Sequence, residues 1–141
     1  MDILNLKFNE YNFSIAWLMA FGNLEISAME NHMGFDIDVR SLEGTNNLSG
    51  FMKYFEAYMT KVDYDEEYTI LDSRQIAIKG KSFELREFLV TQYEYRDYHI
   101  LSLCCQVNDN YFLCVKVDFW ADNAGAKEVI LESVSNGIEF Y

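Results

Sequence analysis

Two histidines are the side chains of this 141-residue chain best suited to acid–base catalysis or metal binding. His99 lies in a strand-like run with apolar neighbours, and His32 lies in a break between two such runs. Neither is accompanied by a cysteine–histidine pair at metal-binding spacing or by a serine in a nucleophile motif, so nearby sequence does not supply the roles of a catalytic triad. We therefore interpret both histidines as structural or surface residues.

The three cysteines lie inside predicted strands at positions 104, 105 and 114. Adjacent residues of a strand point to opposite faces, so Cys104 and Cys105 cannot share one ligand geometry. The set is odd in number and lacks the spacing of a zinc site. We interpret these residues as small buried hydrophobic side chains in a reducing cytosol, and we expect neither a metal nor a cofactor.

The glycine pattern does not predict a nucleotide site. Gly44 and Gly50 bracket the start of a predicted helix, but they lack the lysine and the third glycine of a phosphate-binding loop. The sequence thus has no recognisable reaction centre, and we predict that the protein is not an enzyme. Catalysis through Asp36 and Asp38, or through His99, is the less favoured alternative.

Acidic residues give the chain its strongest charge signal. Asp and Glu number 23 against 11 Lys and Arg, a formal net charge of −12. Such a charge repels nucleic acid and anionic lipid and attracts basic proteins, so we expect neither nucleic acid nor membrane as a partner. No positive segment precedes an apolar run at the N-terminus, and the stretch from Ile15 to Phe21 is too short to span a bilayer, so we expect a cytoplasmic protein.

Three long strand-like runs dominate the pattern of elements that must position these side chains. They span Phe83 to Phe119, are rich in β-branched and aromatic residues, and are separated by turn formers at residues 96–97 and 108–110. This pattern predicts an antiparallel meander. Shorter runs with period-two alternation predict further strands: Leu4–Phe8, Tyr11–Ile15, Leu24–Met29, Phe35–Arg40 and, as a pair or one bent strand, Tyr68–Leu71 and Gln75–Lys79.

Two amphipathic helices are expected beside the strands. Apolar residues at spacings of three and four predict one helix from Leu48 to Val62 and a second from about Ala124 to Ser135. Asp122 or Asn123 is the expected N-cap of the second helix, and Asn136–Gly137 is its expected end. The chain has the length of one domain and shows no repeat, linker or proline, so we expect a single domain over residues 1–141.

The order of the elements resembles a known fold. The matching positions are the strand Phe35–Arg40, the helical residues Phe51 to Met59, the Ile76-x-Ile78-x-Gly80 step, and Gln106 in the strand after the long hairpin. They resemble the PsbP-like α/β/α sandwich, in particular the small DcrB-like domains, and among these the effector-associated chaperones of bacterial type VI secretion. The resemblance implies an α+β fold in which an antiparallel meander sheet is flanked by two helices.

The resemblance also implies a function. The resemblance implies a cytosolic, often dimeric protein whose concave sheet shelters an apolar segment of a secreted effector. On this hypothesis the chain is a non-catalytic chaperone or adaptor of a bacterial toxin-delivery system, with another protein as its partner and a homodimer as one assembly. Tyrosine contributes contact area at low entropic cost. The expected partner contacts in the meander are Tyr93, Tyr95, Tyr98, Ile100, Leu113 and Val115.

An alternative use of the same small acidic chain is an immunity protein that binds and neutralises a basic toxin domain. The net charge of −12 favours this alternative, because electrostatic steering speeds the capture of a cationic partner. The acidic residues would then be the contacts: Asp36, Asp38, Asp63, Asp65, Glu66 and Glu67. The last four are expected to form a solvated loop between the first helix and the next strand.

Overall fold

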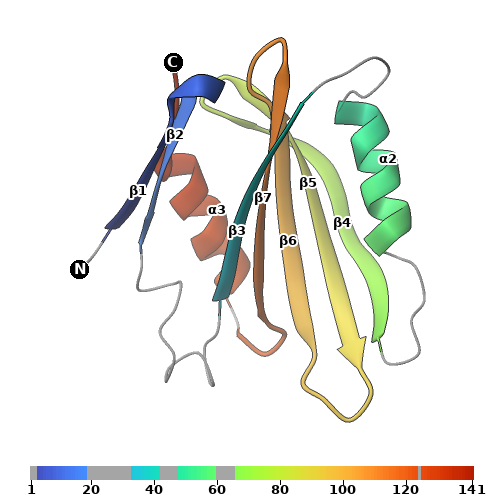
Figure 1. The fold of residues 1–141 in the computed structure, drawn as a ribbon. Coiled ribbons are helices and arrows are strands. Elements are labelled where there is room, and N and C mark those ends of the chain that lie inside the picture. The colour runs from blue at the N-terminus through green and yellow to red at the C-terminus, as the bar shows by residue number, and fades with distance from the viewer. Residues whose placement is uncertain (1–2, 19–32, 42–47, 60–65, 124) are drawn as a thin grey trace.

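The computed structural model describes residues 3–18, 33–41, 48–59, 66–123 and 125–141. In this part of the chain the structure is α+β, with two antiparallel sheets and two helices (Figure 1). The predicted strand Leu24–Met29 and His32 lie outside the described residues.

The larger sheet has five strands in the order β3-β7-β6-β5-β4. Their bounds are Met33–Ser41 (β3), Glu66–Ile78 (β4), Lys81–Gln92 (β5), Tyr98–Gln106 (β6) and Tyr111–Trp120 (β7). All neighbours pair antiparallel, and β5, β6 and β7 form the meander that the sequence predicts. Strands β3 and β4 are therefore the two edges of this sheet.

Strand β4 is one long strand with a bulge rather than two strands. Ile70 pairs with Phe88 of β5, but Asp72 pairs with Glu87, so Leu71 is an extra residue at this point. Successive strand residues point to opposite faces, and the insertion therefore turns Asp72 to the face that carries Glu87.

The smaller sheet joins segments from both ends of the chain in the order β1-β2-β8. Strands β1 (Ile3–Phe8) and β2 (Phe13–Leu18) form the predicted opening hairpin around a 3₁₀ turn at Asn9–Tyr11. Strand β8 (Ile138–Phe140) pairs with β2. The sequence did not predict β8, because three residues directly after a helix are too few to show a period.

The helices are α2 (Leu48–Met59) and α3 (Ala126–Gly137), close to the predicted ranges. The prediction of Asp122 or Asn123 as N-cap of α3 was wrong. The N-cap is Gly125 at φ +82° without a side-chain cap, and the backbone oxygen of Asn123 accepts the amide hydrogen bond of Ala126 at 3.3 Å instead. No helix in the described ranges is long and apolar enough to cross a membrane.

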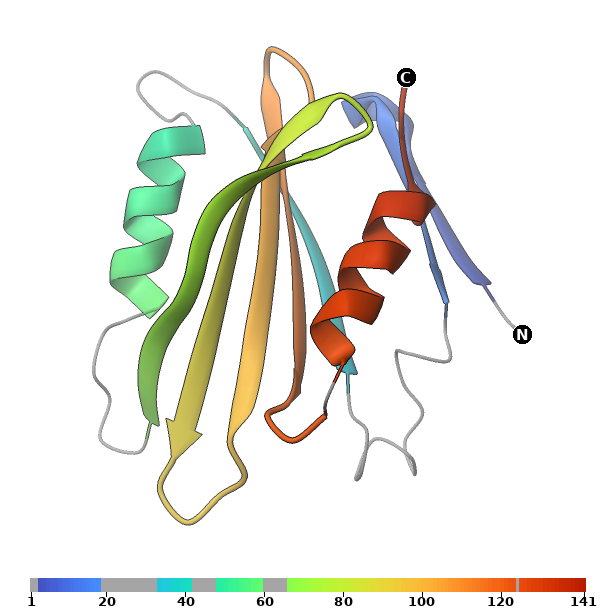
Figure 2. The same ribbon diagram turned by 180° about the vertical axis from the view of Figure 1, so that it is seen from behind.

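The two faces of the larger sheet support separate apolar cores. Leu101 and Leu103 of β6 join the core with α3, together with Phe13 of β2, whereas Cys104 joins the core with α2. This division follows from the alternation of side chains along a strand. Figure 2 shows α3 lying across the face of the sheet opposite α2.

Candidate protein-binding surface

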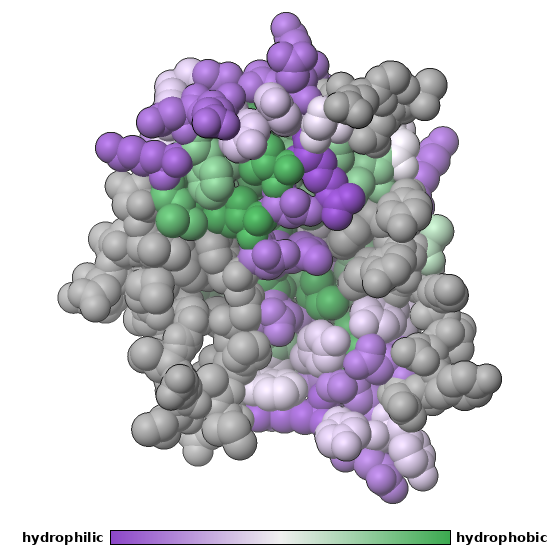
Figure 3. All heavy atoms as spheres, in the orientation of Figure 1, coloured by the Kyte–Doolittle hydropathy of each residue, from purple (hydrophilic) through white to green (hydrophobic). Residues whose placement is uncertain are grey.

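The hairpin tip between β5 and β6 carries the two most exposed large hydrophobic side chains in the described part of the chain. Tyr93 is 71% exposed and Tyr95 is 75% exposed. Both were predicted as partner contacts, and both lie at the end of the sheet where β5 and β6 are joined (Figure 1). In Figure 3 the described residues at this lower end are hydrophilic or near neutral in colour, while the strongly hydrophobic ones gather higher on the sheet. The surface offered here is therefore amphipathic rather than purely apolar.

Backbone hydrogen bonds and the Gln92 side chain hold the tip in one shape. The amide of Tyr95 donates to the carbonyl of Gln92 at 3.4 Å, and Nε2 of Gln92 donates to the carbonyl of Arg96 at 2.7 Å. The amide of Gln92 also donates to Oδ1 of Asp97 at 3.3 Å, and the amide of Ala121 donates to the Asp97 carbonyl at 3.0 Å. The tip is thereby tied to the segment after β7.

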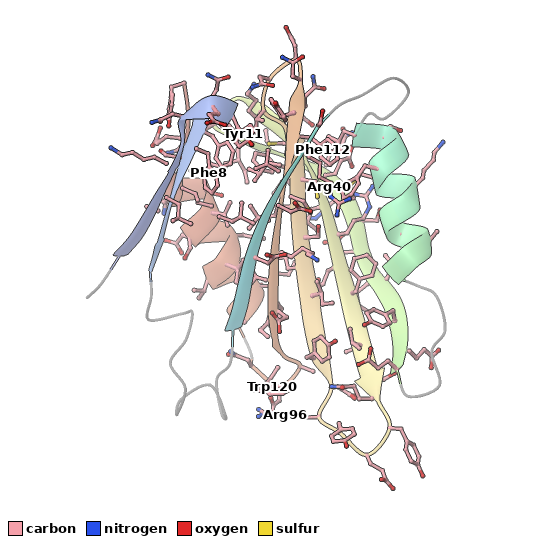
Figure 4. The ribbon with its side chains drawn as sticks, in the orientation of Figure 1. Phe8, Tyr11, Arg40, Arg96, Phe112 and Trp120 are labelled. Carbon is pink, nitrogen blue, oxygen red and sulfur yellow. The ribbon has the colours of Figure 1, made fainter. Side chains whose placement is uncertain are left out.

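Arg96 adds a side-chain brace between the tip and β7. Its guanidinium lies 4.5 Å from the centre of the Trp120 ring, a cation–π distance, and its Nη2 donates to Oδ1 of Asp122 at 2.6 Å. Figure 4 shows Arg96 next to Trp120 at this end of the sheet. The hydrogen bond from Arg96 lowers the pKa of Asp122 from its ordinary value. A braced loop has less conformational freedom to lose on binding.

Two further predicted contacts, Tyr98 and Ile100, lie on the sheet face beside α2. They are half-buried, and Ile100 packs at the border of the core under α2. Tyr68 of β4 lies on the same face, and its hydroxyl donates to Oε2 of Glu66 at 2.8 Å. Burial raises the pKa of Tyr68, and the hydrogen bond to Glu66 raises it further. Burial is also the main cause of the raised pKa of Tyr98.

The structure corrects the prediction for Leu113 and Val115. Both side chains are fully buried in the core with α3, so neither presents a contact surface. The reason is that β7 is covered on both faces: Leu113 and Val115 meet α3, and the intervening Cys114 meets the core under α2. A nearly continuous apolar run indicates such a strand but does not reveal which face is covered.

The predicted acidic contacts do not form one patch. Asp36 and Asp38 lie on β3, whereas Glu66 and Glu67 begin β4 at the opposite edge of the sheet and are not in a loop. The two edges are about 19 Å apart across four strand spacings. The predicted contacts Asp63 and Asp65 lie outside the described residues.

Asp36 and Asp38 are also paired with basic residues of this chain. Nζ of Lys116 lies 3.8 Å from Oδ2 of Asp36, and Nε of Arg40 donates to Oδ2 of Asp38 at 2.7 Å. These side chains are largely exposed, so each pair contributes little to stability. The local charge at this edge is therefore partly balanced.

The sequence did not predict a network of charged groups on the sheet face beside α3. Nζ of Lys127 in α3 donates to Oε1 of Glu87 at 2.7 Å and to Oδ2 of Asp72 at 3.0 Å. Nδ1 of His99 lies 2.8 Å from Oε2 of Glu87, and the His99 ring stacks on Phe119 at 5.1 Å. The bulge at Leu71 makes the arrangement possible, because it places Asp72 on the face of Glu87.

The sequence did contain a signal for these charged groups. Glu87 lies in phase with Phe83 and Leu85, which face the core with α3, and His99 lies in phase with Leu101. A carboxylate and an imidazole that alternate in step with buried apolar residues point into the core, where they require polar partners. Here Lys127 and Asp72 complete the pairing, so the geometry fits a structural role for His99.

The cysteines lie in the sheet interior. Cys104 and Cys114 are directly opposite each other on β6 and β7, with the hydroxyl oxygen of Ser102 at 3.4 and 3.3 Å from their sulfurs. Burial raises the pKa of the Cys104 thiol and raises that of Cys105 to about 12. Within the described residues, no group of three or more His, Cys, Asp and Glu side chains is placed to hold a metal ion.

The fold is similar to that of a solved structure. The solution structure of cyanobacterial PsbP (CyanoP) from Synechocystis sp. PCC 6803 aligns with a TM-score of 0.66 over 99% of this chain and 92% of that chain, at 8% sequence identity. The likeness supports the PsbP-like fold that the element order predicts, and at this identity it shows the fold alone. No family model and no curated protein matches the sequence.

Proposed function

We propose that this chain is a non-catalytic protein-binding module that holds a partner polypeptide with the β5–β6 hairpin tip and the neighbouring sheet face beside α2. The observation that carries the proposal is the pair Tyr93 and Tyr95, exposed by more than two thirds on a loop that is braced at both ends. Exposed aromatic residues on a rigid support favour association, since their burial releases water while little chain freedom is lost.

The resemblance to effector-associated chaperones suggests the biological setting. In this proposal the protein acts in the cytoplasm as a chaperone or adaptor of a bacterial toxin-delivery system and shelters an apolar segment of a secreted effector. Tyr98 and Ile100 extend the contact from the tip onto the sheet. An apolar segment needs such shelter because exposed apolar surface promotes aggregation.

An immunity protein against a basic toxin domain is the second candidate, and the net charge of −12 favours it. The separation of Asp36 and Asp38 from Glu66 and Glu67 on opposite sheet edges weakens the idea of a single acidic contact patch. The two candidates differ in the salt dependence that they require. An electrostatic complex weakens when the ionic strength rises, whereas a complex held by apolar contacts persists.

Co-expression with the product of the neighbouring gene, followed by pull-down at about 0.1 M and about 1 M NaCl, tests the proposal. We expect a complex that survives high salt and that the double substitution Tyr93→Ser/Tyr95→Ser weakens at least tenfold. The matched control is Tyr141→Ser, which removes a tyrosine that is 57% exposed at the opposite end of the molecule (Figure 1). Tyr141→Ser loses the hydrogen bond from the Tyr141 hydroxyl to the Phe13 carbonyl, which lowers the stability of the protein. We nevertheless expect this variant to bind the partner as well as the parent chain does.

Loss of the complex at high salt, with full binding by Tyr93→Ser/Tyr95→Ser at low salt, would favour the immunity candidate. Equal weakening by the tip variant and by Tyr141→Ser would show that stability, not contact, governs binding. Either result contradicts the proposed role of the hairpin tip.

A further inference from the structure

Cys104 of β6 and Cys114 of β7 lie directly opposite each other in the larger sheet. Both are free thiols, and both are buried in the core under α2. Cys105, the third cysteine of the chain, is buried on the other face in the core with α3 and lies opposite Leu113. Only Cys104 and Cys114 are therefore placed to react with each other, and we call them the cysteine pair.

Backbone hydrogen bonds at the two ends of the β6–β7 ladder define the geometry of the cysteine pair. At one end the amide of Val107 donates to the carbonyl of Tyr111 at 3.0 Å. At the other end the amide of Ala121 donates to the carbonyl of Asp97, also at 3.0 Å, and both bonds continue the register of the strands. Hydrogen-bonded and non-hydrogen-bonded pairs alternate along an antiparallel ladder. Counted from either end, the cysteines form a non-hydrogen-bonded pair.

A non-hydrogen-bonded pair brings its two side chains closest together. Its Cα atoms lie about 4.5 Å apart, whereas those of a hydrogen-bonded pair lie about 5.5 Å apart. A disulfide requires Cα atoms roughly 4.4–6.8 Å apart. The backbones of β6 and β7 can therefore accept a bond between the two sulfurs with no change in strand register.

The surroundings of the cysteine pair favour a thiolate at Cys114. The hydroxyl oxygen of the fully buried Ser102 lies 3.3 Å from Sγ of Cys114 and 3.4 Å from Sγ of Cys104. Hydrogen bonding from the Cys104 thiol is the main cause that lowers the pKa of Cys114, and it outweighs the opposing effect of burial. Burial raises the pKa of the Cys104 thiol. The thiolate is the reactive form of cysteine, so Cys114 is the nucleophile of the pair.

We propose that Cys104 and Cys114 are a redox-active pair that hydrogen peroxide converts to a disulfide between β6 and β7. The Cys114 thiolate attacks one peroxide oxygen, the O–O bond breaks, and a sulfenic acid and hydroxide form. Sγ of Cys104 then attacks the Cys114 sulfur, and the sulfenic oxygen leaves as hydroxide while the S–S bond forms. The two hydroxides take up the two thiol protons. Two thiols are thus oxidised by two electrons, and one hydrogen peroxide is reduced to two waters.

Local opening beside α2 gives the peroxide access to the pair. In the described part of the chain, Phe51 and Met52 of α2 cover this core, whereas Cys105 lies in a core to which both α3 and the smaller sheet contribute. Opening of one element costs less free energy than unfolding of the whole chain. In a reducing compartment the pair stays as two thiols until an oxidant is present, and small thiols reverse the disulfide afterwards.

The test treats the reduced full-length chain with hydrogen peroxide and maps its cysteines by mass spectrometry after alkylation under denaturing conditions. Cleavage before aspartate separates residues 97–108, which contain Cys104 and Cys105, from residues 109–117, which contain Cys114. We expect these two peptides to be joined by a disulfide between Cys104 and Cys114, with Cys105 alkylated. The disulfide should form at least about tenfold faster than peroxide oxidises Cys105 in the same sample, because Cys105 reacts only after global unfolding.

Cys105→Ala is the matched control, because it removes the neighbouring buried thiol on the other face of β6. We expect this variant to form the disulfide within about twofold of the parent rate. Cys104→Ala should stop at a sulfenic acid on Cys114 that dimedone traps, and Cys114→Ala should give at least about tenfold less trapped sulfenic acid. Thermal melts check that each variant is folded, and the map of the parent chain decides the question if a variant is not.

A parent chain whose Cys104 and Cys114 stay reduced in excess peroxide would overturn the inference. A disulfide from Cys105 to either other cysteine would also overturn it, as would oxidation of all three cysteines at one rate, because strand register would then not govern the reaction. None of these outcomes involves a partner protein. The proposed function is decided separately by Tyr93→Ser/Tyr95→Ser in the co-expressed complex.

Discussion

Replacing Gly137 with alanine tests the packing of α3 against β2, because two opposing effects act at this position. Alanine is favoured over glycine inside a helix by about 1 kcal/mol, so an unobstructed site would gain stability. A Cβ on Gly137, however, would lie 3.1 Å from the carbonyl carbon of Ala16 and would overlap its oxygen. The sign of the change shows which effect prevails.

The steric effect is expected to prevail. The obstacle is backbone of β2, which cannot rotate away like a side chain, so β2 must move by about 1 Å from α3. Strand β2 carries Phe13 and Ile15, both fully buried, and pairs with β8. Overpacking of this kind costs about 1–3 kcal/mol. Set against the helix gain of about 1 kcal/mol, this leaves a net loss of about 1 kcal/mol, or roughly fivefold in the folding equilibrium constant.

Urea unfolding followed by tryptophan fluorescence measures this loss. We expect a lower midpoint with an unchanged slope, and a melting temperature lower by roughly 3–4 °C. Asn136→Ala is the matched control one residue earlier: its side chain is exposed, so stability should stay within about 0.5 kcal/mol. A Gly137→Ala variant as stable as the parent chain or more stable would refute the described approach of α3 to β2.

Two further predictions concern ionisable groups in the sheet. Hydrogen bonding to Lys127 lowers the pKa of Asp72 below its ordinary value of 3.8, so this stabilisation is complete above about pH 4 and is lost as the pH falls through the folded value. Lys127→Met should therefore cost about 1–2 kcal/mol at pH 7 and flatten the acid limb of a stability–pH curve; an unchanged acid limb would contradict this. Cys105 is fully buried, and a pKa of about 12 leaves roughly 10⁻⁴ of it as thiolate at pH 8. Thiol reagents should therefore label Cys105 only at the rate of unfolding, and rapid labelling of Cys105 in the folded chain would contradict its burial.

The fold was predictable where local pattern and final environment agree. The meander from β5 to β7 follows from long β-rich runs between turn formers, and α2 and α3 follow from apolar spacing. The cap at Gly125 and the short strand β8 were not predictable, since they depend on how α3 reaches the smaller sheet. The bulge at Leu71 is likewise a matter of pairing with β5, which single-strand periodicity does not contain.

The candidate surface was predictable only in part. Tyr93 and Tyr95 lie beside turn formers, where exposure is the expectation, and they are exposed. Leu113 and Val115 lie in a strand that both helices cover, and only the tertiary arrangement shows this. The brace between Arg96 and Trp120 joins residues 24 positions apart, so no local pattern announces it.

Amide hydrogen exchange of the chain alone and in its co-expressed complex measures the binding surface most directly. We expect the partner to slow exchange across the hairpin tip at residues 92–98 and at the start of β4, residues 66–70. Protection confined to β1, β2 and α3, with the tip exchanging as fast as in the free chain, would contradict it.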